Sequence, residues 1–242
     1  GLALITLVVQ LAVAAVLSLR FWTRYDMDAD TAVWSGVFHS VCAFNNAGFS
    51  LYPDSLIGFS SDWMVLVPVM AAIIIGGLGF PVLVDLRRVN GRWRHLTLHS
   101  KVTLAATGAL LVGGFVVLSV LEWRNPATLG PMPLPDKVLN GTFASVTPRT
   151  AGFNSIDIAS MQPESLLATT ALMFVGAGSA GTSGGIKVST FGILALVVWS
   201  QLRGDADVTG FRRRIPDDTQ RQATTVVLLA LGLVVVTTGV LL

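Results

Sequence analysis

The sequence predicts an all-α integral membrane protein assembled from repeated helix–pore-loop–helix units. Three observations lead to this class. Charged residues make up only 12% of the 242 residues, against roughly 25% in an ordinary soluble domain, and the mean hydropathy is +0.70. Apolar runs recur at the length that crosses a bilayer. One short motif occurs twice, in the same setting each time. A soluble globule of this size is therefore excluded.

Several apolar runs have the length of about 20 residues that a helix needs to cross a hydrocarbon core of about 30 Å. The four continuous runs are residues 2–19, 63–84, 102–121 and 223–242. A fifth apolar region, 166–199, is interrupted by the glycine-rich residues 176–185. Two shorter apolar stretches, 31–44 and 138–146, cannot span and are predicted to be re-entrant or interfacial helices.

The chain divides accordingly into five parts. A first repeat covers residues 1–85, a loop 86–101, a second repeat with a broken second helix 102–201, a second loop 202–222, and the first helix of a further repeat 223–242. The chain begins without Met inside one apolar run and stops inside another, which predicts a fragment of a longer protein.

The basic residues predict the orientation of these parts. Ten of the 16 Lys and Arg residues lie in the two loops: Arg87, Arg88, Arg92, Arg94, Lys101, Arg203, Arg212, Arg213, Arg214 and Arg221. The positive-inside rule places both loops in the cytoplasm. The opposite loops carry an acidic excess, which indicates an outer vestibule that attracts cations or, equally, ordinary solvated loops.

An internal repeat is the most specific feature of the sequence. Residues 38–49 (FHSVCAFNNAGF) return as residues 143–153 (FASVTPRTAGF), with one residue fewer before the glycine. Each copy follows a spanning run and an outer loop, and precedes another outer loop and another apolar run. This arrangement predicts a duplication of one supersecondary unit.

The repeated unit could conduct cations for a physical reason. A short helix that enters from outside points the negative end of its dipole to the middle of the membrane. The chain then returns in an extended form, whose carbonyls can replace the hydration shell of a cation if they line a water-filled path. A central glycine permits the dihedral angles that aim successive carbonyls at one axis, and Gly48 and Gly152 hold this position. The alternative is that both glycines only turn a packed loop.

The glycine-rich break is the second candidate site. It contains Gly176, Gly178, Gly181, Gly184 and Gly185, together with Ser179, Thr182 and Ser183. Each glycine costs about 1 kcal/mol in a helix relative to alanine, so an unwound segment is expected. Irregular backbone at this depth must line a cavity or pack against protein, which favours a flexible gate beneath the filter. Lys187 closes the segment, either as a functional intramembrane cation or as a side chain that snorkels to the inner interface.

The sequence does not support an enzymatic function for these residues. In a nucleotide phosphate loop, lysine directly follows the last glycine and Ser or Thr follows the lysine, whereas here Ile186 intervenes and Val188 follows. The sequence arranges no Ser, Cys or His with partners for covalent or acid–base catalysis. The protein is therefore expected not to be an enzyme, and no nucleic-acid partner is expected.

Three segments carry a family resemblance. Residues 44–50 (FNNAGFS), 145–154 (SVTPRTAGFN) and 176–187 (GAGSAGTSGGIK) resemble the superfamily of Trk, Ktr and HKT potassium transporters. Residues 96–101 (LTLHSK) and the short loops are most similar to the bacterial Ktr membrane subunit. The resemblance covers essentially the whole chain. It implies four units around a pseudo-fourfold pore of potassium-channel type, of which this chain would supply repeat two, repeat three and the first helix of repeat four.

The resemblance also implies the site residues and the partners. The selectivity filter would comprise Asn46, Ala47, Gly48, Phe49, Ser50, Thr150, Ala151, Gly152, Phe153 and Asn154, with K⁺ at the backbone carbonyls near the two glycines. Residues 176–187 would form the intramembrane gating loop. The transported ion would be K⁺, with Na⁺ as a second candidate and no organic cofactor in this chain. The family implies a homodimer in the cytoplasmic membrane on a cytoplasmic ring of nucleotide-binding regulatory subunits, and the basic loops could face that ring or membrane lipids.

The leading functional hypothesis is therefore potassium uptake through a carbonyl filter above a glycine-rich gate. The first alternative is an ion-coupled carrier of a small solute, built on the discontinuous helix at a repeat interface. Carriers commonly have inverted repeats, whereas both loops here are predicted to enter from the same side. The second alternative is a structural or regulatory membrane subunit.

Overall fold

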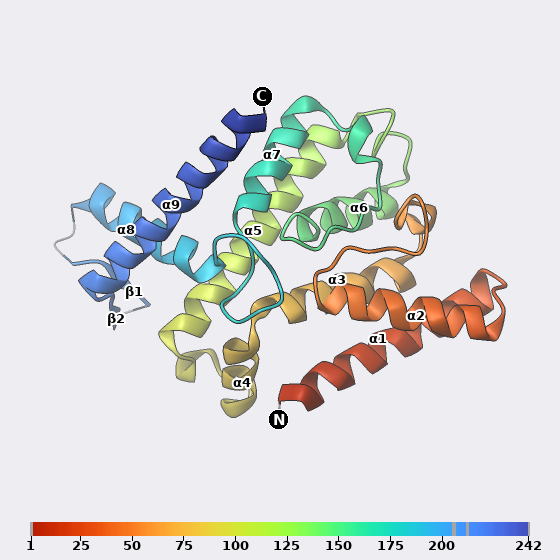
Figure 1. Cartoon of the computed structure of the whole chain (residues 1–242), viewed down its shortest axis with the longest axis horizontal. Coiled ribbons are helices and arrows are strands. Elements are labelled where there is room, and N and C mark those ends of the chain that lie inside the picture. The colour runs from red at the N-terminus through yellow and green to blue at the C-terminus, as the bar shows by residue number, and fades with distance from the viewer. Residues whose placement is uncertain (1, 205–206, 212, 242) are drawn as a thin grey trace.

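The computed structural model describes residues 2–204, 207–211 and 213–241 (Figure 1). Nine α-helices lie in these residues: α1 (Leu2–Arg24), α2 (Ala29–Phe44), α3 (Trp63–Leu78), α4 (Phe80–Arg88), α5 (Leu98–Glu122), α6 (Leu134–Val146), α7 (Pro163–Phe174), α8 (Val188–Arg203) and α9 (Asp217–Leu241). A two-residue hairpin, β1 (Thr209–Gly210) and β2 (Arg213–Arg214), precedes α9. Arg212 of the predicted basic loop and the predicted end of the last helix at Leu242 lie outside the described residues.

The helices agree with most of the predicted apolar segments. Three of them, α1, α5 and α9, are long and apolar enough to cross a membrane. The two shorter predicted helices are α2 and α6, and the interrupted region consists of α7, an irregular loop and α8. The all-helical class predicted from composition and hydropathy is confirmed.

The apolar run predicted to span at residues 63–84 consists of two helices, α3 and α4. The chain bends by 93° between α3 and α4. Gly79 makes the bend possible because its φ of +84° is a backbone conformation that residues with a side chain rarely adopt. A Cβ atom at this glycine would also lie 2.2 Å from the carbonyl oxygen of Ser179. The glycine-rich loop therefore packs directly against the bend.

The two repeats predicted from the sequence, called here the first unit (residues 1–85) and the second unit (residues 102–201), pack their helices in the same way. In the first unit, Ser40 donates a 2.6 Å hydrogen bond from α2 to the carbonyl of Gln10 on α1. In the second unit, Ser145 donates a 2.6 Å bond from α6 to the carbonyl of Leu111 on α5. These two serines correspond in the sequence repeat.

A matching pair of glycines brings the helices of each unit close together. A Cβ atom on Gly36 would lie 2.2 Å from Ser18 Oγ, and one on Gly141 would lie 2.3 Å from Ser119 Oγ. Small residues at helix contacts let backbones approach in membrane proteins, where dispersion contacts and hydrogen bonds hold helices together. The repeat therefore extends from the motif to the packing of the helices around it.

The two units share one hydrophobic core. Phe21 and Phe44 of the first unit and Phe153 of the second are at most 1% exposed and belong to the same cluster of side chains. In Figure 1 the first unit runs from red through orange to yellow, and its helix α3 packs against α5 and α6. This core holds the segments that follow α2 and α6 against each other.

Candidate functional site

The segment after α2 leaves the helix through two left-handed residues. The backbone amides of Asn46 and Ala47 still donate to the carbonyls of Ala43 and Cys42, at 3.2 and 2.9 Å. Asn46 then adopts a φ of +50° and Gly48 a φ of +71°. The chain continues without regular secondary structure to Ser50.

The segment after α6 has the same backbone pattern. Its amide at Ala151 donates to the carbonyl of Thr147 at 3.0 Å. Thr150 has a φ of +64° and Gly152 a φ of +79°. Aligned on their glycines, the two copies therefore have positive φ angles at the same two positions. A non-glycine residue with positive φ is uncommon, so this shared conformation is specific to the repeated motif.

The structure brings the two predicted filter segments into contact. A Cβ atom on Gly48 would lie 2.6 Å from the carbonyl oxygen of Ala151 and 2.7 Å from the Cα of Gly152. A Cβ atom on Gly152 would lie 3.0 Å from the Cα of Gly48. Neither position has room for a side chain while its neighbour stays in place. Residues 104 positions apart in the chain thus form one site.

The outer ends of the two segments are joined by hydrogen bonds. The amide of Asn154 donates to Ser55 Oγ at 3.0 Å, and its carbonyl accepts from the amide of Leu56 at 2.9 Å. Ser50 Oγ donates to the carbonyl of Ser55 at 3.1 Å. The carbonyl of Phe153 accepts from the Thr147 hydroxyl. The carbonyls of residues 153 and 154 thus serve the packing of the site.

The two phenylalanines of the motif have different surroundings. Phe153 is fully buried in the shared core, whereas Phe49 is 69% exposed. The resemblance grouped both with the filter. In the part of the chain that the structure describes, Phe153 packs the second segment in place and Phe49 lies on the surface.

The glycine-rich segment forms a closed loop with adjacent ends. The amide of Gly176 donates to the carbonyl of Ile186 at 2.8 Å, and the amide of Ile186 donates to the carbonyl of Phe174 at 3.3 Å. Within the loop, Ser183 Oγ accepts from the amide of Ala177 at 2.7 Å. The loop lies near the bend between α3 and α4 in Figure 1.

Three hydrogen bonds hold this loop against the end of α2, the second filter segment and the end of α3. Thr182 Oγ1 donates to the carbonyl of Phe44, the last residue of α2, at 3.0 Å. The amide of Gly184 donates to Thr150 Oγ1 at 3.2 Å. The amide of Gly178 donates to the carbonyl of Gly77 at 2.7 Å. Residues predicted as filter and residues predicted as gate are therefore in direct contact.

Close backbone contacts explain why glycine recurs in the loop. A Cβ atom at Gly176 would lie 1.8 Å from the carbonyl oxygen of Gly184, and one at Gly178 would lie 2.1 Å from that of Leu78. A Cβ atom at Gly181 would lie 2.8 Å from the carbonyl oxygen of Gly77. Gly185 has a φ of +73°. The loop is thus packed backbone against backbone.

The remaining polar side chains of the segment hold its C-terminal end. Lys187 Nζ donates to the carbonyl of Ser183 at 2.7 Å, so its ammonium group binds the loop itself. Ser179 Oγ and Ser189 Oγ lie 3.0 Å apart and share a hydrogen bond. Both contacts tie the loop to the first turn of α8.

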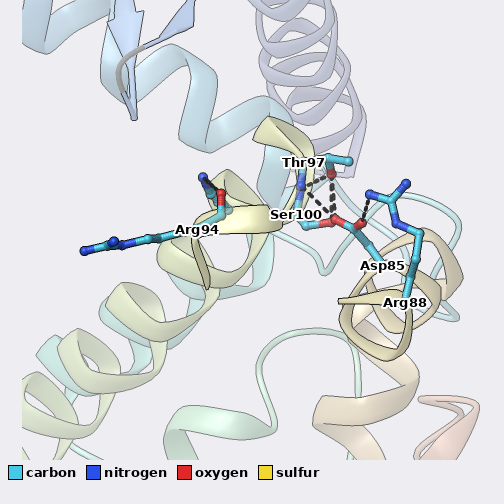
Figure 2. Close-up of polar contacts among 6 residues, drawn as sticks. Asp85, Arg88, Arg94, Thr97 and Ser100 are labelled. Atoms are coloured by element: carbon cyan, nitrogen blue, oxygen red, sulfur yellow. Dashed lines mark hydrogen bonds and ion pairs between the residues drawn. The ribbon is translucent and has the colours of Figure 1, made fainter. Parts of the chain in front are cut away.

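A carboxylate at the end of α4 fixes the bent helix to the start of α5 (Figure 2). Asp85 Oδ2 accepts from the amide and the hydroxyl of Thr97, at 2.8 and 2.9 Å, and Oδ1 accepts from Arg88 at 2.9 Å. Asp85 lies in α4, after the bend at Gly79. The Thr97 amide, followed by the Ser100 hydroxyl, lowers the pKa of this carboxyl to about 2. This cluster was not predicted from the sequence, because Asp85 and Thr97 are 12 positions apart and no local pattern pairs them.

We expect Asp85→Asn to lower the stability of the protein by about 1–3 kcal/mol, because the buried donors of Thr97 would face a weaker acceptor. Arg88→Ala is the matched control. It removes an ion pair whose arginine side chain is 65% exposed, and such pairs contribute about 0–1 kcal/mol. Thermal unfolding of the purified full-length variants in detergent measures the loss of stability in Asp85→Asn and in Arg88→Ala. Equal apparent Tm values for Asp85→Asn and wild type would contradict the assignment of Asp85 as the anchor of α4.

Comparisons with known proteins agree with this architecture. Residues 2–241 match the TrkH family model, described as cation transport protein. The chain is 41% identical over 216 residues to the Ktr system potassium uptake protein B of Bacillus subtilis, covering 88% of this chain and 47% of that protein. It is 38% identical over 234 residues to the potassium/sodium uptake protein NtpJ of Enterococcus hirae, covering 97% of this chain and 51% of that protein.

A solved structure shows the same fold. The chain superposes on the crystal structure of the potassium transporter TrkH from Vibrio parahaemolyticus with a TM-score of 0.63 and 19% sequence identity, covering 80% of this chain and 39% of the other. The chain spans about half the length of the curated relatives that it matches. On the family match over nearly all of its residues, the chain belongs to the TrkH family of cation transport proteins, which are membrane proteins and not enzymes.

Proposed function

We propose that the full-length parent of this chain takes up potassium across the cytoplasmic membrane through a carbonyl-lined filter that the glycine-rich loop gates. One observation carries this proposal: the segments around Gly48 and Gly152 meet with the same backbone conformation, and the loop of residues 176–187 binds the end of α2, which leads into the first segment, and Thr150 of the second. The names of the relatives, which refer to potassium and to potassium/sodium uptake, support K⁺ as the ion and Na⁺ as a second candidate.

The proposed path uses the backbone at two levels. The C-terminal ends of α2 and α6 bring partial negative charge to the site. Above them, the carbonyls of residues 46–48 and 150–152 supply ligands, since those of Phe153 and Asn154 are already acceptors of hydrogen bonds. Movement of a cation inward at an inside-negative potential gains about 2.3 kcal/mol per 100 mV, which can drive uptake.

The complete pore requires segments beyond those of this chain. Residues 1–85 and 102–201 would be repeats two and three, with residues 223–242 as the first helix of repeat four. Since four repeats surround the pore in the proposed architecture, these two supply two of the four sides of the filter. We further propose a homodimer that docks on a cytoplasmic ring of nucleotide-binding subunits, with the basic loops 86–101 and 202–222 toward that ring and the inner lipid headgroups. The name "Ktr system" of the relatives supports an assembly of several subunits.

Cation flux into liposomes that contain the full-length parent protein tests the proposal. We expect uptake of K⁺ that depends on an inside-negative potential and exceeds uptake of Na⁺. Liposomes with a correctly inserted protein that carry no cation flux, with or without its cytoplasmic partner, would overturn it. Flux of an organic solute coupled to an ion gradient would favour the carrier alternative.

A further inference from the structure

One buried cation beside the proposed filter lacks an acidic partner among the residues that the structure describes. Arg149 directly precedes the second filter segment and is only 4% exposed. Its Nε has no hydrogen-bond partner, and no described carboxylate lies within ion-pair distance of its guanidinium. Buried charges in membrane proteins are costly and mark functional sites when they persist.

A second unpartnered group shares its cavity. Asn46 of the first filter segment is 9% exposed, and both its Oδ1 and its Nδ2 lack hydrogen-bond partners. Asn46 and Arg149 line one cavity, together with Gly77 at the end of α3, Thr107 of α5 and Ala177 of the glycine-rich loop. The cavity therefore lies where both filter segments, two helices and the loop meet.

The cavity is too small for a chloride ion or a larger counter-ion. Its water-accessible volume is about 10 Å³, close to the minimum that a single water molecule requires. One water could bridge the side chains of Arg149 and Asn46, since buried polar groups in proteins are hydrogen-bonded. Water and amide dipoles solvate the guanidinium without cancelling its charge.

Arg149 is also close to the proposed ion path. It lies three residues before Gly152, so the Cα atoms of the two residues are at most about 11 Å apart. Two unit charges at this order of separation interact measurably at the effective dielectric constants of proteins. A positive charge at this place repels a cation in the filter.

We propose that the Arg149 guanidinium is a fixed positive charge behind the filter that weakens the binding of the transported cation and so speeds its release. The inference rests on the proposed function. In this role Arg149 weakens the binding of K⁺ and of Na⁺ equally. The geometry of the filter carbonyls, not the charge, distinguishes the two ions.

Transport kinetics of the full-length protein in liposomes test this role. We expect Arg149→Gln, which keeps a donor for the cavity, to lower the KM for K⁺ and for Na⁺ by about threefold to tenfold, with the ratio of the two unchanged. Arg149→Lys keeps the charge and should retain the wild-type KM. Equal KM values for wild type and Arg149→Gln, or an equal shift in Arg149→Lys, would overturn the proposal.

A second pair of variants tests the charge without removing the arginine. Thr107→Asp places a carboxylate in the same cavity from α5, and we expect it to lower KM as Arg149→Gln does. Thr107→Asn is the uncharged control and should leave KM unchanged. If Thr107→Asp and Thr107→Asn behave alike, the proposal is wrong even if the Arg149 variants fail to insert. Wild-type protein that carries no cation would instead refute the proposed function.

Discussion

Gly152→Ser in the full-length protein is expected to reduce the preference for K⁺ over Na⁺ by at least about tenfold, which corresponds to about 1.4 kcal/mol of differential binding. Gly152 has a φ of +79°, where a residue with a side chain is strained by about 1–3 kcal/mol. The new Cβ would also lie 3.0 Å from the Cα of Gly48. Both effects move the facing filter segments, whose carbonyl positions decide which ion fits.

Gly48→Ser should have the same effect, because its Cβ would lie 2.6 Å from the carbonyl oxygen of Ala151. Gly113→Ser is the matched control, since this glycine of α5 has open space around its Cβ position. Paired K⁺ and Na⁺ flux measurements in liposomes compare the three variants. An unchanged ion preference in both Gly48→Ser and Gly152→Ser would refute the filter assignment.

Deletion of residues 177–184 is expected to raise cation flux more than tenfold. The deleted residues donate four hydrogen bonds to the end of α2, to Thr150 and to the end of α3, each with a net contribution of about 1 kcal/mol. Gly176 and Gly185 can be joined directly, because a Cβ atom on Gly185 would lie only 3.1 Å from the backbone nitrogen of Gly176. Loss of the loop would therefore open the path and leave α7 and α8 in place.

A smaller change tests the same contact. Thr182→Val removes the hydroxyl that binds the carbonyl of Phe44, so we expect flux to rise about twofold to fivefold. Thr170→Val is the control, because the exposed Thr170 hydroxyl donates only to the Leu166 carbonyl of its own helix, α7. Flux of K⁺ at matched expression levels is the measurement. Unaltered or abolished flux in the deletion variant would show that the segment is a structural break and not a gate.

Much of the fold was predictable because the membrane imposes strong constraints on sequence. Apolar runs such as residues 102–121 identify helices by their length alone, and the structure has α5 at that place. The repeated motif predicted that Gly48 and Gly152 hold equivalent positions. Their positive φ angles agree with that prediction, since a left-handed backbone position selects glycine regardless of its tertiary neighbours.

The bend at Gly79 could not be predicted with the same certainty. Residues 76–81 (GGLGFP) are apolar and rich in glycine, and such residues also occur in straight membrane helices where they serve close packing. At the bend, the carbonyl of Ser179, which comes from a segment 100 positions later, leaves no room for a side chain at residue 79. Competition for space between distant segments leaves no local pattern in the sequence.

The sequence by itself determined that this is a helical membrane protein, that it contains a duplicated unit, and which glycines lie at the centre of each copy, because hydropathy, repetition and left-handed backbone are local properties. Only the tertiary structure decided that the two copies meet at Gly48 and Gly152, that the loop of residues 176–187 contacts both, and that Arg149 is buried beside Asn46 without an acidic partner. These are contacts between residues far apart in the chain, and they depend on how helices pack.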